Sequence, residues 1–275
     1  MERILVLVNG SGPERATMEF ACYIANLTHS RLIGLFLDAE PKNQTRASNI
    51  RGSKKEAVVN TVKLADRRKH LDDSKLSFQM FCDNHQLNCK PDVIELTNPE
   101  EIYLQSRFAD LMIITADAEV VSEDEDIPSE LATTVLKNAE CPVFIAPLTF
   151  KEMNEIVFTY DGSPSSVFAI KQFTHLFPNL SELPVTFLEV NKDGSGDIRY
   201  KESITEYLAD HYKYVNEMVL RGRPENELFS YFLEKKEVIV VMGSFGRMLI
   251  SSIFHRSTAT LLLKTTSLPV FISHQ

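Results

Sequence analysis

The sequence predicts an α/β protein built from two Rossmann-like domains, each a five-stranded parallel sheet flanked by helices and packed against the other as a pseudo-dimer. Two observations carry this prediction. The chain of 275 residues repeats itself once along its length. Within each repeat, short apolar runs without alternation lie between helical patterns, as expected for strands buried on both faces of a parallel sheet.

The internal repeat sets the domain organisation. The segment "ERILVLVNGSG" (2–12) corresponds to "NEIVFTYDGSP" (154–164), and "LATTVLKNAECPVFIA" (131–146) corresponds to "TATLLLKTTSLPVFIS" (258–273), with about half of the positions identical. In the same register "LMIITADAE" lies over "VIVVMGSFG". A period this long is far beyond that of a solenoid, so each copy should be a domain with its own core. We expect domains over 1–148 and 154–275.

The second copy shows the predicted elements most clearly. Runs such as "VIVVM" are apolar throughout, and the segments between the runs have helical patterns. Strands are expected at 155–160, 184–190, 212–219, 238–242 and 269–273. Helices are expected near 164–176, 200–210, 224–235 and 256–266. This order predicts a parallel sheet with right-handed crossovers.

The first copy carries an insertion of roughly 25 residues between its second and third strands, by comparison of the two repeats. It falls around 42–81, where a long charged helix is expected. The segment "CDNHQLNC" follows, with Cys82, His85 and Cys89. Three soft ligands suit zinc, but a structural site needs a fourth. We therefore expect no metal here, and instead a helix end running into the third strand with cysteines packed as small apolar groups.

Composition excludes several classes of function. The net charge of -9 argues against a general role on nucleic acid. The N-terminal apolar run is too short for a signal peptide, and no stretch is long enough to cross a bilayer. Four cysteines in a chain of this length do not make a disulfide framework. We expect a cytoplasmic protein with reduced thiols and no membrane partner.

Candidate binding residues gather where the winding of the second sheet should reverse, which is where open α/β sheets bind ligands. Asp161 and Ser163 follow the first strand, and Gly243 and Gly246 follow the fourth. Ser257–Thr258 stand at the start of the next helix, where backbone N–H groups attract anions. The Asp161 carboxylate would repel phosphate but would accept hydrogen bonds from a base or sugar.

These residues resemble the universal stress protein family in its tandem two-domain form, with the adenine nucleotide alpha hydrolase-like fold. The family motif is a glycine, two residues, a glycine, nine residues, then a glycine before Ser or Thr, with an Asp ending the first strand. Here Gly243 and Gly246 match, and "CPV" and "LPV" precede the last strands. The resemblance implies ATP or ADP, with Mg²⁺, in the C-terminal domain only. The implied binding residues are Asp161, Gly162, Ser163, Val190, Met242, Gly243, Gly246, Arg247, Arg256, Ser257 and Thr258.

The second copy departs from the motif at Arg256, which replaces the third glycine. If that glycine is needed for close backbone approach, the arginine side chain blocks the phosphates. If it is not, the guanidinium could pair with them, for which its shape is suited. The sequence leaves both readings open.

The first copy departs further. Asn9 replaces the Asp, Ala116 and Glu119 replace the glycines, and Glu130 replaces the serine. The loop "EVVSEDEDIPSE" between these positions is crowded with carboxylates, which would repel a triphosphate. We expect a degenerate site and a structural role for this half.

The resemblance implies a stress-linked regulatory or binding protein without catalytic residues. It also implies that the domains contact each other through the last strands, near 142–146 and 269–273, and it allows a homodimer. A scaffold that binds no nucleotide, its crevice filled by its own side chains, is the first alternative. A slow ATP hydrolase is the second.

Overall fold

The computed structural model describes residues 1–8, 14–37, 54–85, 87, 92–96, 98, 100–117, 129–191, 197–243 and 268–273. In these residues all strands belong to one ten-stranded sheet, in the order β3-β2-β1-β4-β5-β10-β9-β6-β7-β8. Neighbouring strands run parallel everywhere except at β5 and β10, which are antiparallel. The predicted fold class, two five-stranded parallel sheets joined as a pseudo-dimer, is confirmed.

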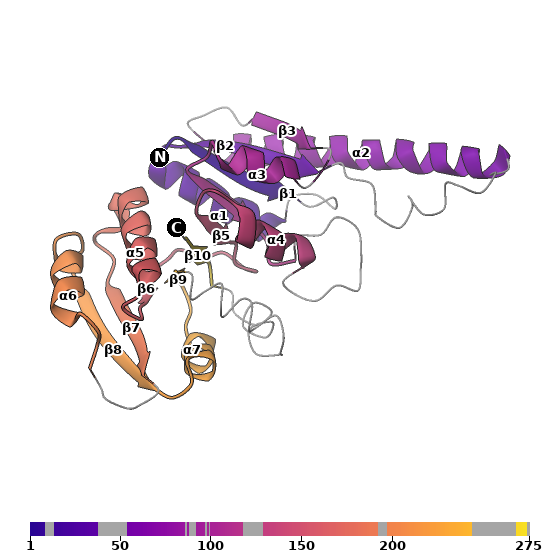
Figure 1. The fold of residues 1–275 in the computed structure, drawn as a ribbon. Helices are drawn as coiled ribbons and strands as arrows, with labels where there is room; N and C mark the ends of the chain where they lie inside the picture. The colour runs from indigo at the N-terminus through magenta and orange to yellow at the C-terminus, as the bar shows by residue number, and fades with distance from the viewer. Residues whose placement is uncertain are drawn as a thin grey trace.

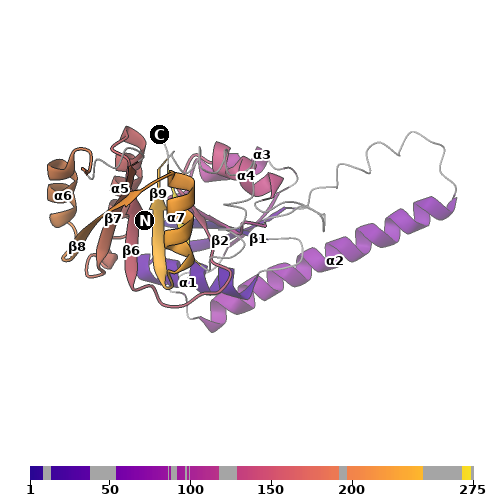
Figure 2. The same cartoon turned by 90° about the horizontal axis from the view of Figure 1, so that it is seen from below.

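The first half alternates strands and helices as the sequence predicts. Its strands are β1 (Arg3–Val8), β2 (Arg31–Leu37), β3 (Asp92–Leu96), β4 (Leu111–Ile114) and β5 (Val143–Ile145). Its helices are α1 (Arg15–Thr28), α2 (Lys54–Asn84), α3 (Glu100–Ser106) and α4 (Glu130–Asn138). The insertion forms α2, which projects beyond the rest of the chain (Figures 1 and 2). The part of the prediction over 42–53 lies outside the described residues.

The second half repeats this arrangement. Its strands are β6 (Glu155–Thr159), β7 (Val185–Asn191), β8 (Val215–Arg221), β9 (Val238–Met242) and β10 (Val270–Ile272). Its helices are α5 (Pro164–Leu176), the short 3₁₀ helix η1 (Pro178–Leu180), α6 (Lys201–Ala209) and α7 (Pro224–Leu233). The helix expected at 256–266 lies outside the described residues.

The prediction of the third strand at 212–219 was wrong by two to three residues at each end. The Tyr212 N–H donates to the carbonyl of Leu208, which closes the end of α6, and the tyrosine is buried. Its hydroxyl lies 3.0 Å from Oγ1 of Thr174 on α5. Because Tyr212 packs beneath the sheet, the strand starts only at Val215, and it pairs with β7 as far as Arg221.

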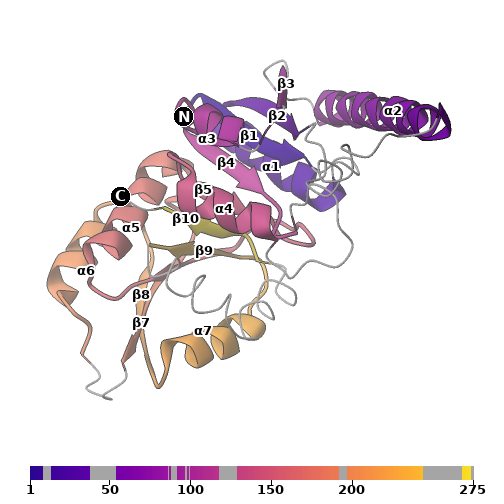
Figure 3. The same cartoon turned by 45° about the vertical axis from the view of Figure 1, so that its right-hand side comes forward.

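The two halves are joined by like segments, as the family resemblance implies. β5 and β10 both read Val-Phe-Ile, and in the antiparallel pair Phe144 lies opposite Phe271. Figure 3 shows the two strands side by side at the middle of the molecule. Each strand would otherwise be the exposed edge of its half, so their pairing removes two free edges.

The core is divided by the sheet into two layers. Buried residues of α1, α2, α5 and α6 pack on one face, and those of α3, α4 and α7 pack on the other. The first layer runs across both halves through a chain of aromatic contacts. Its rings belong to Phe20, Phe144, Phe173, Phe177 and Phe271. The two halves therefore share a core.

The structure describes part of the cysteine-rich segment at the end of α2. Cys82 is buried in the last turn of α2, and His85, just after the helix, stacks on Phe81 with ring centroids 4.2 Å apart. β3 begins at Asp92. Cys89 lies outside the described residues. Within the described ranges there is no group of three or more His, Cys, Asp or Glu side chains that could hold a metal ion. Nor is any helix in these ranges long and apolar enough to span a membrane.

Candidate functional site

The strand order places a crevice in the second half between β6 and β9. β6 is connected through the chain to β7 on one side, and it pairs with β9 on the other, so the winding reverses between them. Ligands of open α/β sheets bind beyond the carboxyl ends of the strands at such a point. Asp161 follows β6 and Gly243 follows β9. The structure therefore brings the two predicted segments to one edge of the sheet.

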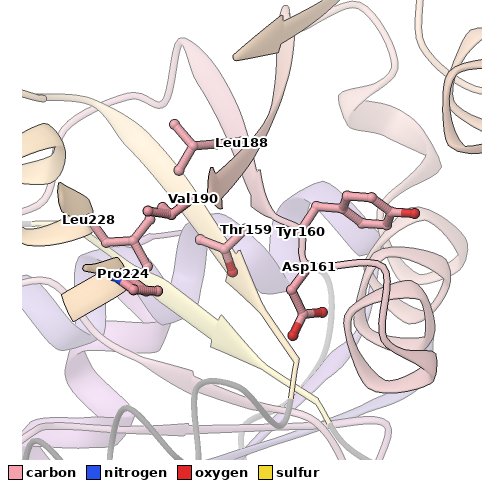
Figure 4. Close-up of a pocket in the computed structure, with 7 residues that line it drawn as sticks. All are labelled: Thr159, Tyr160, Asp161, Leu188, Val190, Pro224 and Leu228. Carbon is pink, nitrogen blue, oxygen red and sulfur yellow. The ribbon is translucent and has the colours of Figure 1, made fainter. Parts of the chain in front are cut away.

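A cleft opens at this edge, with about 320 Å³ of space outside the atoms, part of it open to solvent. The residues that line it come from the ends of β6 and β7 and the first turns of α7, and Figure 4 shows them. They are Thr159, Tyr160, Asp161, Leu188, Val190, Pro224 and Leu228. Most of the wall is apolar, and one carboxylate stands at its side.

One carboxylate oxygen of Asp161 forms a hydrogen bond within its own turn, and the other can accept a further one. Its Oδ1 accepts a hydrogen bond of 2.9 Å from the backbone N–H of Ser163. Ser163 in turn caps α5, because its Oγ accepts from the Ser166 N–H at 3.2 Å. Among the described residues none donates to Oδ2 of Asp161. Figure 4 shows the carboxylate and the Tyr160 ring pointing to different sides. The turn thus fixes a carboxylate that can still accept a hydrogen bond.

The apolar wall is positioned by strand register. Thr159 pairs with Leu188 in the β6–β7 ladder, and Asp161 and Val190, each two residues further along the chain, both line the cleft. Leu188 and Val190 face the side of the sheet that α7 covers. Leu228 of α7 closes that side and is itself buried. Asp161 and the predicted residue at the end of the second strand therefore lie around one cleft, and their contact with a base stays a prediction.

Gly243 is required by packing within the protein. A Cβ at this position would lie 2.5 Å from the carbonyl oxygen of Ser165 and 2.7 Å from the backbone nitrogen of Ser166. Real Cβ atoms do not approach backbone this closely, and the first turn of α5 cannot move without losing its Ser163 cap. The sequence interpretation assigned this glycine to ligand approach. Contact between β9 and α5 explains it without a ligand.

The turn that carries Arg199, a residue with no role in the sequence analysis, covers the same strand ends from the opposite face. Arg199 donates from Nη1 to the Asp161 carbonyl oxygen at 3.1 Å, and its Nε lies 3.4 Å from Oε1 of Glu189. Glu189 is 1% exposed, and its Oε2 accepts from the Arg199 N–H. Burial raises the pKa of Glu189, Arg199 opposes this shift, and the Asp161 charge adds to it. An ionisable residue inside an apolar strand was the available signal.

Of the other predicted binding residues of this half, the structure describes Gly162 and Met242. Gly162 has a φ of 71°, in the left-handed region that favours glycine. Met242 ends β9 and is partly exposed. The remaining predicted residues lie outside the described part of the chain. They are Gly246, Arg247, Arg256, Ser257 and Thr258.

In the first half, the corresponding helix start is capped by the protein itself. Ser129, which aligns with Arg256, accepts the Ala132 N–H on its Oγ at 3.1 Å and donates its own N–H to the Ala116 carbonyl. Glu130 follows it in the first turn of α4. A capped helix start with a carboxylate beside it is a poor anion site. Asn9 and Glu119 lie outside the described residues.

Comparison with known proteins identifies the fold. No family model matches the sequence, and no curated protein matches it. Among solved structures, a universal stress protein from Archaeoglobus fulgidus superposes with a TM-score of 0.64 at 13% identity, covering 98% of both chains. A Pseudomonas aeruginosa protein assigned to the universal stress proteins has a TM-score of 0.56 at 12% identity, covering 99% of this chain and 93% of its own. A functionally unknown protein from the same species scores 0.55 at 13% identity, covering 98% and 92%. The chain therefore has the universal stress protein fold over both halves.

Proposed function

We propose that this chain is a tandem universal stress protein, with domains at 1–148 and 154–275, that binds one adenine nucleotide in its second half. It acts as a stress-linked cytoplasmic regulatory protein. The nucleotide is ATP or ADP, and its base occupies the cleft between Asp161 and Val190. The first domain contributes the shared core and no binding site of its own.

The observation that carries the proposal is the composition of the cleft. Leu188, Val190 and Leu228 make the wall of the cleft apolar, as the ring of a base requires, while Asp161 offers an acceptor at its edge. The exocyclic amino group of adenine and the hydroxyls of ribose are donors, so they match a carboxylate oxygen. Phosphates would not match it, because like charges repel. We therefore place the phosphates toward Gly246 and Ser257–Thr258, as the family motif implies.

The charge distribution supports one site per chain. In the second half, Gly246 and Ser257 occupy the positions that Glu119 and Glu130 occupy in the first. In the first half, Ser129 also uses a helix N–H that an anion would need. A nucleotide would thus meet two extra carboxylates and a capped helix there.

A scaffold that binds no nucleotide is the second candidate, and Gly243 favours it. The packing of β9 on α5 accounts for this glycine, and the Asp161 turn is complete on one oxygen without a ligand. On that reading the segment between β9 and β10 fills the crevice, with Arg256 and Phe245 as the side chains. A slow ATP hydrolase has less support, because no observation favours a catalytic base.

Mass spectrometry of the native protein separates the first two candidates. The protein is purified gently at low salt, denatured, and the released small molecules are identified. We expect ATP or ADP at close to one molecule per chain. Protein that is free of nucleotide, and that takes up none when incubated with millimolar ATP and Mg²⁺, would support the scaffold instead.

A further inference from the structure

The turn that carries Arg199 is held against the candidate site by several independent contacts. Glu189 of β7 accepts the Arg199 backbone N–H at 2.9 Å, and the Tyr160 hydroxyl donates to the Arg199 carbonyl oxygen at 2.8 Å. Asn191 donates from its amide to the carbonyl oxygen of Asp197 at 3.0 Å. The turn is thus tied to the ends of both β6 and β7, the two strands that line the cleft.

The guanidinium of Arg199 makes the contact that reaches Asp161. Its Nη1 donates to the Asp161 backbone carbonyl, while its Nε faces the buried carboxylate of Glu189. Gly162, the next residue, has no Cβ, and one built there would lie 2.8 Å from the Cβ of Arg199. Arg199 therefore packs directly on the peptide that follows Asp161.

The buried carboxylate of Glu189 depends on the positive charge of Arg199. The carboxylate is 1% exposed, and its Oε1 has no hydrogen-bond partner within the described part of the chain. A buried carboxylate without a cation nearby is strongly disfavoured. Arg199, although its side chain is 66% exposed, is the cation beside it. Removal of the guanidinium would leave Glu189 uncompensated and release the link to Asp161.

We propose that Arg199, held by Glu189, is a positioning residue for the nucleotide site: it fixes the backbone at Asp161 so that the carboxylate faces the cleft. Arg199 does not line the cleft, so it acts through Asp161. The effect of Arg199 on nucleotide binding rests on the proposed function. The positioning itself has a readout that needs no ligand.

The ligand-free readout is hydrogen exchange of the Ser163 amide, which donates to Asp161 Oδ1. In ¹⁵N-labelled protein, Arg199→Ala is expected to speed exchange at Ser163 by about tenfold or more beyond any change at core amides such as Phe271. Arg199→Lys retains a cation beside Glu189 and should restore part of the protection. Lys201→Ala is the matched control. Lys201 lies two residues after Arg199, and its replacement removes only the exposed ion pair with Glu217. It should leave Ser163 exchange as in the wild type.

The binding readout is adenosine affinity. Arg199→Ala should weaken it by about tenfold, the effect of one misplaced hydrogen-bonding group, while Lys201→Ala leaves it unchanged. Equal Ser163 exchange in wild type and Arg199→Ala would overturn the positioning role, whatever the binding result. Faster exchange at Ser163 in a protein that binds neither adenosine nor ATP would uphold the positioning of Asp161 and contradict the proposed function alone. An equal increase in exchange at Ser163 and at the core amides would show only a loss of global stability and overturn the proposal.

Discussion

Phe144 and Phe271 lie opposite each other where the two halves meet, with ring centroids 5.2 Å apart and planes at 71°. Each is the central residue of a Val-Phe-Ile strand. On either side of the phenylalanine pair, the valine of one strand lies opposite the isoleucine of the other. A pseudo-twofold axis therefore passes between these two rings. One chain has the symmetry of a dimer, with a fully buried contact on the axis.

This contact predicts a large cost for truncation at the axis. Phe271 is completely buried and contacts three other rings. Phe271→Ala should lower the free energy of unfolding by about 3–5 kcal/mol. Phe108→Ala is the control, because Phe108 is 64% exposed, and it should change stability by less than about 0.5 kcal/mol. Urea denaturation measures both, and similar values for the two variants would contradict a shared core.

Gly243 predicts a second effect on stability. Gly243→Ala forces a Cβ against the backbone of Ser165 and should cost about 1–3 kcal/mol, as overpacking does. Ala116→Gly, at the corresponding position of the first half, opens space and should cost about 1 kcal/mol or less. Thermal unfolding of both variants checks this. A Gly243→Ala protein as stable as the wild type would mean that the glycine serves only a ligand.

We expect the thiol of Cys141 to be unreactive toward alkylating reagents in the native protein. Burial raises its pKa from 9.0 to about 12, so the thiol stays protonated at neutral pH in the native protein. The Cys141 peptide should escape iodoacetamide at pH 8 and react fully in guanidinium chloride. Because the folded pKa is the higher one, the stability from this thiol is full below pH 9 and is lost as the pH rises toward 12. Rapid labelling of native Cys141 at pH 8 would contradict the burial.

Replacing Arg256 tests whether its side chain blocks the phosphates or pairs with them. We expect Arg256→Gly to strengthen ATP binding by about tenfold or more and to leave adenosine binding unchanged, because a glycine there allows the backbone to approach the phosphates. If the guanidinium instead pairs with phosphate, the same variant loses a charge-assisted contact and ATP binds more weakly. Parallel titrations with ATP and adenosine decide between them.

Most of the fold was predictable because it depends on pattern. Unbroken apolar strands and a repeat in exact register identify a two-part parallel sheet, and the apolar last strands predicted the β5–β10 joint. The start of β8 was not predictable, since Tyr212 leaves the strand to pack beneath the sheet through a contact with Thr174 that is distant in sequence.

The site divides in the same way. Asp161 and Val190 were predicted from the ends of their strands, and both line the cleft in the structure. Arg199 was missed because its role depends on Glu189 and the Asp161 carbonyl, which only the folded chain brings together. Gly243 was predicted as a binding residue from the family motif, but the packing that requires a glycine there involves the backbone of α5, which no local pattern reveals.

Calorimetric titration of ATP against wild type, Asp161→Asn and Gly246→Glu tests the central claim most directly. Asparagine keeps the acceptor for the Ser163 N–H and removes the negative acceptor from the cleft, so the fold is retained. We expect one site per chain in the wild type, about tenfold weaker binding in Asp161→Asn, and no measurable binding in Gly246→Glu. Two equivalent sites per chain, or binding that neither variant changes, would contradict a single nucleotide site in the second half.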